Sequence, residues 1–470
     1  MFTDGMVLQR DSPVHVWGWS DNKGLKIHVD FLGQKKIGTV GDDGKWSVAL
    51  DPMLVSTKPD TLRVYADGEG AEERDVAGVL VGDVWLVDGQ SNADLTSATV
   101  FDSTHLYDKD QAEINSDDNI RLFATSRWDA FNNPPLMYAE QANPIKATYR
   151  WKKCDRDSVR EFSAIGYFFA KEIAAKTKNA IPIGMVMVAS GGSPLYELMP
   201  PALGQELGYT VPATTVIPVG GMFNALLAPV QKMSIKGMIY YQGESDDGRD
   251  GVYAEHLSRF VEDLRRRFNT AFPFYYVQLS SHADPAITPG KGWATIQKIR
   301  VAQLQALDLI PNSAMVVSID QGWRDPDPDN LRTAIDWAHP IRKKPIGQRL
   351  AALALARDYK IGGMNSASSP LPEKAAWDAN GVIIRFKYTG AGLAPEAGGD
   401  ARALKGFTLI DADGKETPAA ARITDKSHVR VEGVARPIEV RYAYTPFEPV
   451  EAANLGTKSG LPAPTFVLKK

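Results

Sequence analysis

Six short apolar runs, several of them separated by stretches of helical periodicity, most strongly constrain how this chain can fold. The runs are Val84–Val87, Ile120–Phe123, Ile183–Ala189, Gly237–Tyr241, Phe274–Leu279 and Ala314–Ile319. Such runs are typical of strands that are buried on both faces of a sheet. Strands that alternate with helices predict a mostly parallel sheet covered on both sides, with the chemistry outside the carboxyl ends of the strands. We therefore predict an α/β core over residues 81–362.

The sequence on either side of this core has a different periodicity. Before residue 81, segments such as 14–19, 25–31 and 46–50 alternate apolar and polar side chains, which is typical of half-buried strands. After Gly362-Gly363, short strand-like segments return between Gly- and Asp-rich turns. A chain of 470 residues is long enough for two or three domains. We predict an N-terminal β domain over residues 1–80 and a C-terminal β domain over residues 363–470.

Composition excludes several classes of protein. The 53 Lys and Arg residues nearly balance 57 Asp and Glu, and a formal charge of −4 gives no general attraction for nucleic acid or anionic lipid. The single cysteine, Cys154, cannot form an internal disulfide or a cysteine-rich metal site. The sequence contains no apolar run of the roughly 20 residues that a membrane helix needs, and no P-loop or dinucleotide fingerprint. We expect no metal and no cofactor.

The turn Gly89-Gln90-Ser91-Asn92 directly follows the first apolar run of the core. A serine in a tight turn at the carboxyl end of a strand can present its hydroxyl as a nucleophile, with main-chain N–H groups facing the developing oxyanion. A polar turn with a helix-capping serine is an equally good interpretation of these four residues. Ala93 stands where an α/β-hydrolase elbow has its second glycine, which disfavours that fold.

A serine nucleophile needs a base, and His339 is the strongest candidate among the seven histidines. Asp336 precedes it by three residues, a spacing that lets one loop hold the carboxylate against the far ring nitrogen. His282, which follows the run Phe274–Leu279, is the second choice. An acid close to a histidine is common by chance, so this motif is weak when taken alone.

Two further polar clusters follow apolar runs, Ser190-Gly191-Gly192-Ser193 and Gln242-Gly243-Glu244-Ser245. Glycines expose main-chain N–H groups and a glutamine amide is a neutral donor, so either cluster can serve an oxyanion hole. Taken singly, each is more simply a Gly-rich loop or a capping Glu. Together with Ser91 and the Asp336/His339 pair, they predict one reactive edge of the sheet.

The chain resembles the sialate O-acetylesterase family of SGNH-type carbohydrate esterases, nearly from end to end. The blocks that carry the resemblance are Asp4–Arg10, Val16–Trp19, Asp43–Trp46, Gly82–Leu86, Gly89–Asn92, Phe162–Ala170, Tyr241–Ser245, His339-Pro340 and Gly460–Ala463. The resemblance implies a three-layer, flavodoxin-like SGNH-hydrolase core flanked by β-sandwich or jelly-roll-like segments. It also implies a catalytic triad of Ser91, His339 and Asp336.

By the same resemblance, the oxyanion hole uses the Ser91 N–H, the Gly192 N–H and the Gln242 amide. This chain departs from the family pattern in three places. One extra residue separates Asp336 from His339, the block before the double glycine lacks its usual Trp, and Ala93-Asp94 replaces the usual Met after Asn92. The extra residue leaves Glu244 as the alternative acid of the triad.

The implied reaction is hydrolysis of acetyl esters on a carbohydrate through an acyl-enzyme, without a cofactor. The substrate is O-acetylated sialic acid or an acetylated plant polysaccharide such as xylan or xyloglucan, and Trp128, Trp323 or Trp337 could stack on a sugar ring. A non-catalytic glycan-binding protein on the same fold is the rival from another class. We expect a periplasmic or secreted protein whose leader lies outside this sequence, with a cytoplasmic location as the alternative, and no nucleic-acid or membrane partner.

Overall fold

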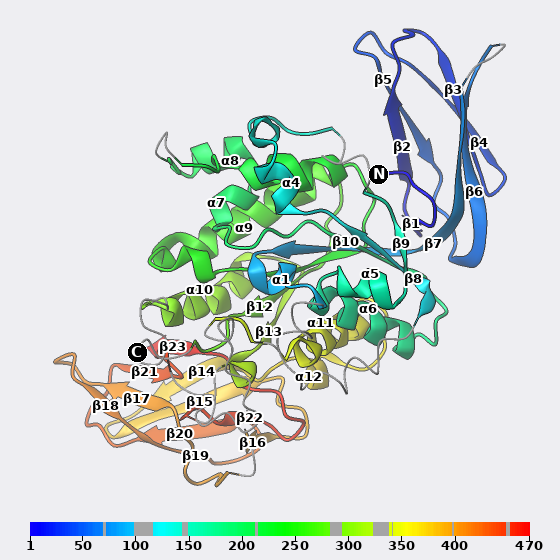
Figure 1. Ribbon diagram of the computed structural model, residues 1–470. Coiled ribbons are helices and arrows are strands. Elements are labelled where there is room, and N and C mark those ends of the chain that lie inside the picture. Colours follow the sequence, from blue (N-terminus) through cyan, green and yellow to red (C-terminus); the bar gives the residue numbers. More distant parts are fainter. Residues whose placement is uncertain are drawn as a thin grey trace.

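The computed structural model shows a central α/β region with β-rich regions at two of its sides (Figure 1). It describes residues 1–68, 72–97, 116–142, 149–211, 215–282, 294–322, 338–340, 342–396, 399–447 and 452–470. Within these ranges, no helix combines the length and the apolar character that a bilayer crossing requires.

The central region is built on one sheet in which the strands follow the order β13-β12-β11-β7-β10-β8-β9. These strands are β7 (Glu73–Gly89), β8 (Asp117–Ala124), β9 (Lys152–Cys154), β10 (Ile183–Met187), β11 (Gly237–Tyr241), β12 (Phe274–Gln278) and β13 (Ser313–Val317). All neighbours from β13 to β8 are parallel, and β9 joins the edge antiparallel to β8. Each of the six apolar runs falls on one of these strands, so the prediction of a mostly parallel sheet is confirmed.

Helices cover both faces of this sheet, as adjacent residues of β12 show. The Tyr275 hydroxyl donates to Asp358 at the end of α11, whereas the Tyr276 hydroxyl donates to the main chain of Gln303 in α10. Because successive side chains of a strand point to opposite faces, α11 and α10 lie on opposite sides of the sheet. The helices of the central region are α1 (Ser91–Asp94), α4 (Arg127–Phe131), η2 (Pro134–Met137), α5 (Arg156–Arg160), α6 (Ala164–Lys176), α7 (Leu195–Leu198), α8 (Pro201–Glu206), η3 (Phe223–Leu227), η4 (Ala228–Val230), η5 (Glu244–Asp246), α9 (Asp250–Arg267), α10 (Ile296–Leu309), η6 (Ile319–Gln321) and α11 (Lys343–Arg357).

Strand β7 is 17 residues long and belongs both to the central sheet and to the N-terminal β region. Its first half pairs with β6, and β1 pairs with it in parallel over residues 80–82. The N-terminal strands are β1 (Val7–Gln9), β2 (Val14–Trp19), β3 (Lys26–Phe31), β4 (Gln34–Thr39), β5 (Lys45–Leu50) and β6 (Ser56–Ala66). The three segments with period-two alternation are all strands, which confirms the β character of this region.

The C-terminal region contains two four-stranded antiparallel sheets, β14-β15-β20-β19 and β18-β17-β21-β23, and a two-stranded ladder of β16 with β22. Rings from both four-stranded sheets meet, since Phe386 and Phe466 have centroids 5.9 Å apart. The elements are α12 (Met364–Ala367), β14 (Leu371–Trp377), β15 (Gly381–Lys387), β16 (Leu393–Pro395), β17 (Phe407–Ile410), β18 (Glu416–Pro418), β19 (Ala420–Ile423), β20 (His428–Glu432), β21 (Glu439–Tyr442), β22 (Leu455–Thr457) and β23 (Phe466–Lys469).

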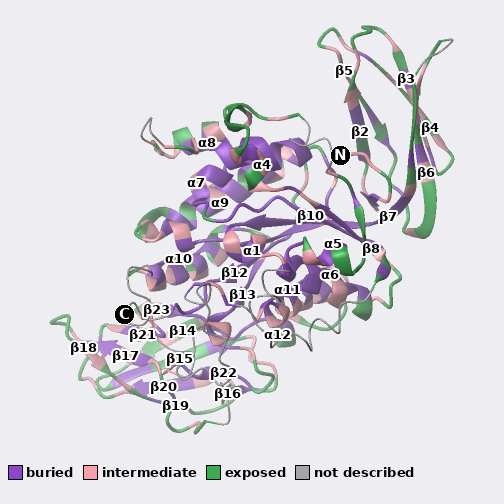
Figure 2. Ribbon diagram, viewed as in Figure 1, coloured by how far each residue is buried: buried purple, intermediate pink, exposed green. Residues whose placement is uncertain are grey.

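Trp85 organises the centre of the sheet. Its indole is fully buried on β7, packs edge-on against Phe169 of α6 at 4.9 Å between ring centroids, and lies over Gly237 of β11. Figure 2 shows the central strands of the sheet in the colour of buried residues. A Cβ atom at position 237 would lie 2.3 Å from the indole, so the strand needs a glycine where it passes Trp85.

We predict that Gly237→Ala lowers the free energy of unfolding by about 1–3 kcal/mol or more, because the buried indole has no room to move away. Urea unfolding followed by circular dichroism measures this effect. Gly251→Ala is the matched control: Gly251 lies in α9 with nothing within 4 Å of the added methyl, and alanine favours a helix. Equal stability of the two variants would contradict the role given to Trp85.

Candidate active site

The end of β7 turns sharply because a glycine allows it to approach β11. Gly89 has a φ of +130°, a region that favours glycine, and a Cβ atom there would lie 2.1 Å from the carbonyl oxygen of Tyr241. The N–H of Gln90 donates to the same carbonyl oxygen at 3.0 Å. The chain therefore leaves the sheet in a tight turn, and Ser91 begins α1 at the carboxyl edge of the parallel strands.

Ser91 and His339 meet at this edge, although 248 positions separate them in the sequence. The Nε2 atom of His339 lies 2.7 Å from the Ser91 Oγ, within hydrogen-bond distance for proton transfer. Both side chains are half-buried. Asp336 lies outside the described residues, as do Trp323 and Trp337.

The loop after β10 brings its two glycines beside the nucleophile. A Cβ atom on Gly191 would lie 3.5 Å from the Ser91 Cα, and Gly192 has a φ of +78°. The Gly191 N–H donates to the Asp94 carboxylate at 3.3 Å. Burial raises the pKa of Asp94, while this hydrogen bond and the charge of Arg127 act in the opposite direction. The main-chain N–H of Gly191 thus already donates to a carboxylate of the same chain.

Gln242 follows β11, but its side chain belongs to a buried network behind the site. The amide nitrogen of Gln242 donates to Asp246 at 2.5 Å, and the amide oxygen accepts from the Tyr253 hydroxyl at 2.9 Å. Gln242 is not among the residues that line the cavity described below. This placement does not support the expectation that its amide faces the oxyanion, because the nitrogen is directed to a carboxylate.

Glu244 contacts Asn92, the residue that follows the nucleophile. The Asn92 amide nitrogen donates to the Glu244 carboxylate and to the main-chain oxygen of Ala338, and the Asn92 oxygen accepts from the Lys343 ammonium. Burial raises the pKa of Glu244 to about 7 and lowers the pKa of Lys343 to about 7. The Glu244 carboxylate, the alternative acid of the triad, thus accepts from Asn92.

His282, the second choice for the base, is fully buried after β12. Burial lowers its pKa well below the ordinary value, and the charges of Arg300 and His339 add to this effect. Its main-chain N–H donates to Pro446, so the side chain lies where the C-terminal region meets the core. The residue within hydrogen-bond distance of the Ser91 Oγ is His339.

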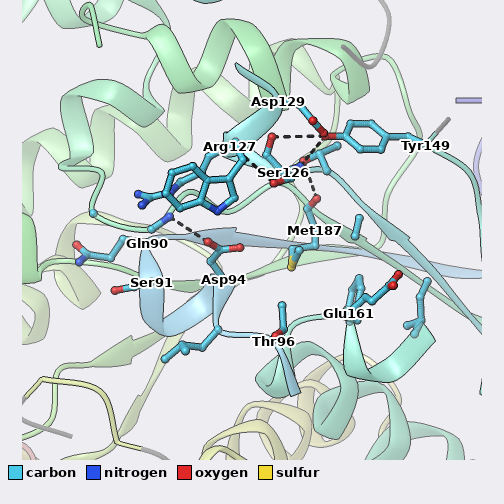
Figure 3. Close-up of a pocket in the computed structure, with 18 of the residues that line it drawn as sticks. Gln90, Ser91, Asp94, Thr96, Ser126, Arg127, Asp129, Tyr149, Glu161 and Met187 are labelled. Atoms are coloured by element: carbon cyan, nitrogen blue, oxygen red, sulfur yellow. Dashed lines mark hydrogen bonds between the residues drawn. The ribbon is translucent and has the colours of Figure 1, made fainter. Parts of the chain in front are cut away.

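A cavity of about 800 Å³ opens beside Ser91 and His339. Figure 3 shows Ser91 and Asp94 projecting from α1 on one side of it, with Ser126, Asp129 and Tyr149 on the other. Its other lining residues include Thr96, Arg127, Trp128, Arg150, Lys152, Glu161, Phe162, Gly191, Gly192 and Ser245. A volume of this size accommodates a small ligand such as one or a few sugar rings.

Comparisons with known proteins point to one family. The family described as "Carbohydrate esterase, sialic acid-specific acetylesterase" matches residues 81–339. The chain belongs to this family. The human sialate O-acetylesterase is 25% identical over 417 residues, covering 82% of this chain and 75% of the relative. The rat sialate O-acetylesterase is 26% identical, covering 99% and 92%.

A solved structure supports the same assignment for the esterase. A carbohydrate acetylesterase from Xanthomonas citri superposes with a TM-score of 0.80 at 29% identity, covering 100% of this chain and 98% of the other. The match runs over the β-rich ends as well as the α/β core. The family resemblance read from the sequence is thus confirmed, and the esterase is a carbohydrate O-acetylesterase.

Sequence analysis did not identify several residues that lie at the site of the esterase. Arg127 lies over the double-glycine loop, with its Nη1 atom 3.3 Å from where a Cβ of Gly192 would be, and it stacks on Trp128 at 4.6 Å. Lys343 reaches Asn92 from the start of α11, and Asp246 holds Gln242. Lys343 follows His339 by four positions and Asp246 follows Gln242 by four, so closeness to a predicted site residue was the available signal.

Asp88, at the end of β7, gives the esterase a pH-dependent stability. Burial raises the pKa of Asp88 to about 8, and the N–H of Gly89 donates to its carboxylate. Because the folded protein binds this proton more tightly than the unfolded chain, the stabilisation is complete below pH about 4 and is lost as the pH rises through about 8.

We predict that Asp88→Asn, which keeps an acceptor for Gly89 without the charge, removes this dependence. The variant should match the wild type near pH 4 and exceed it near pH 8, by a gap that grows by at most about 1.4 kcal/mol per pH unit. Thermal unfolding across that pH range measures it. A gap that stays constant with pH would show that Asp88 does not titrate in the folded protein.

Proposed function

We propose that this carbohydrate O-acetylesterase acts through an acetyl-enzyme formed on Ser91. The observation that carries the proposal is the 2.7 Å contact between the Ser91 Oγ and the His339 Nε2 at the wall of the cavity. His339 takes the proton of Ser91 as the oxygen attacks the acetyl carbonyl. His339 then protonates the departing sugar hydroxyl, and water, activated by the same imidazole, hydrolyses the acetyl-enzyme.

Asp336 completes the proposed triad. His339 must carry its remaining proton on Nδ1 for Nε2 to accept from Ser91, and a carboxylate against Nδ1 favours that tautomer. Asp336 precedes His339 by three residues, and Glu244, the other acid considered, is bound to Asn92. This partner of Glu244 supports the choice of Asp336.

The proposed oxyanion hole uses main-chain donors. The N–H of Ser91 opens α1, and the N–H of Gly192 lies in the loop beside it. Since the Gly191 N–H already donates to Asp94, Gly192 is the better candidate of the two glycines. The Gln242 amide nitrogen donates to Asp246 and Gln242 does not line the cavity, so the proposal rests on the two main-chain groups.

Strand order supports an SGNH-hydrolase core. The parallel strand β8 lies outside β10, at one side of the sheet. If it is set aside and β7, β10, β11, β12 and β13 are numbered one to five, their order in the sheet is 2-1-3-4-5, the flavodoxin-like order. Strand β7 is the first of these strands. Strand β10 lies on one side of it, and β11, β12 and β13 lie on the other. Ser91 follows β7 at that switch point, where open α/β sheets bind their ligands. We propose that regions 1–80 and 363–470 form the flanking β domains.

Arg127 and Trp128 favour an acidic sugar as substrate. The Arg127 guanidinium lies over the loop beside Ser91, where a substrate carboxylate could accept from it. Trp128 lines the same cavity and is 61% exposed, which leaves indole surface for a sugar ring. We therefore propose O-acetylated sialic acid, which carries a carboxylate, as the substrate in preference to neutral acetylated xylan or xyloglucan.

We expect Ser91→Ala to lower kcat for acetate release by about 10⁶ and His339→Ala to be nearly as damaging, because the two residues act as a unit. His282→Ala should be mild, and Ser258→Ala, a helix serine bonded to Leu309, should be silent. Acetate release from p-nitrophenyl acetate measures all four. A Ser91→Ala variant with a tenth of wild-type activity would place the nucleophile elsewhere.

Arg127→Met should discriminate between the two substrate classes. Losing a charge-assisted hydrogen bond should lower kcat/KM for O-acetylated sialic acid by about 10- to 10²-fold, while p-nitrophenyl acetate, which has no carboxylate, should be hydrolysed as before. Acetate release from acetylated sialic acid and from acetylated xylo-oligosaccharides measures the preference. If the xylo-oligosaccharides are the better substrates and Arg127→Met leaves both unchanged, the acidic-sugar proposal is wrong.

A further inference from the structure

A buried cluster of Asn92, Glu244 and Lys343 lies next to the Ser91/His339 pair, and the reaction as proposed does not use it. Asn92, Glu244 and Lys343 are 1%, 2% and 0% exposed, so none of them can take a hydrogen bond from bulk water. The Asn92 side chain lies between the other two: its nitrogen donates to Glu244 and its oxygen accepts from Lys343. We call these three residues the Asn92 cluster.

The Asn92 amide nitrogen also donates to a group outside the Asn92 cluster, the main-chain oxygen of Ala338, at 3.0 Å. Ala338 directly precedes His339. Asn92 directly follows Ser91, so this hydrogen bond joins the immediate neighbours of the two residues whose side chains meet. The donor and the acceptor lie on different segments, α1 and the loop before α11, that only the folded chain brings together.

Glu244 and Lys343 fix the orientation of the Asn92 amide. When Glu244 and Lys343 are charged, the carboxylate can only accept and the ammonium can only donate, so a flipped amide would set a donor against the ammonium and an acceptor against the carboxylate. Lys343 also lies 5.3 Å from the centre of the Tyr241 ring, which favours its charged form. With the amide held in this way, its second N–H has a fixed direction towards Ala338.

We propose that Asn92 is a positioning residue that keeps His339 at hydrogen-bond distance from Ser91 by holding the Ala338 carbonyl. The proposal rests on the proposed function, in which His339 is the base. A displacement of about 1 Å between reacting groups can lower the rate by about 10², which sets the size of the expected effect. Asn92 touches neither the proton nor the substrate in this role, since it acts through the main chain of its neighbour.

The paired variant Asn92→Asp/Glu244→Gln isolates the contact with Ala338. In it the amide and the carboxylate exchange places, so the net charge, the bond between positions 92 and 244 and the bond from Lys343 are all retained. The donation to Ala338 is lost, because a carboxylate cannot donate, and a carboxylate oxygen then faces the Ala338 carbonyl oxygen. We expect kcat for p-nitrophenyl acetate to fall by about 10²-fold with KM changed by less than about threefold, and a urea midpoint close to that of the wild type.

Two single variants serve as controls. Glu244→Gln keeps an acceptor for Asn92 and leaves the donation to Ala338 in place, so it should lower kcat by less than the paired variant does. Asn454→Asp makes the same chemical change at a buried asparagine of the C-terminal region, where the side-chain oxygen accepts from the Lys405 N–H, and should leave kcat unchanged. Should the paired variant fail to fold, Asn92→Ala removes the same donor and leaves space in which Glu244 and Lys343 can pair directly.

Combination with His339→Ala separates positioning from a general structural defect. If Asn92 acts through His339, the paired change should cost nothing further once the imidazole is gone, whereas a structural defect would add to the loss. A paired variant with kcat within about threefold of wild type, in a protein that Ser91→Ala inactivates, would overturn the positioning role and leave the proposed function standing. An active Ser91→Ala variant would overturn the proposed function itself.

Discussion

The close approach of β7 to β11 at Gly89 is the constraint on which the site depends. With any side chain at that position, the carbonyl of Tyr241 would be in the way, and the turn that presents Ser91 could not form. The approach sets the nucleophile between the loops that follow β10 and β11, its two neighbours in the sheet. The glycine loop, the buried amide network and the helix that carries Ser91 therefore occupy one edge because the strands are parallel and in register.

Buried side-chain amides make many of the hydrogen bonds at this edge of the sheet. Gln90, Asn92 and Gln242 are each almost fully buried, and each bonds to groups from other segments of the chain. An amide has both donors and acceptors and carries no charge, so it can join main-chain groups and carboxyls without the desolvation cost of another ion. The carboxyls that these amides bind, Glu244 and Asp246, have raised pKa values because they are buried. These hydrogen bonds join the segments that surround Ser91.

Much of the fold followed from local pattern. The apolar runs predicted all six parallel strands, since a strand covered on both faces must be apolar throughout, and the period-two segments predicted the β regions. The length of β7 was not predictable in this way. It passes from the N-terminal region, where five of its first six residues are exposed or partly exposed, into the core, where every position is buried, so no single pattern of burial runs along it.

For the site, the sequence by itself determined the chemistry that was available: a serine in a Gly-Gln-Ser-Asn turn, a histidine preceded by an acid, and polar clusters after buried strands. Only the tertiary structure decided which of these groups meet. In the folded chain His339 contacts Ser91, although 248 positions separate them. The Gln242 amide donates to Asp246, and the Glu244 carboxylate accepts from Asn92. Strand positions follow from burial, which a short stretch of sequence records. Hydrogen-bond partners depend on side-chain directions fixed by the packing of several distant segments, and no single stretch contains that information.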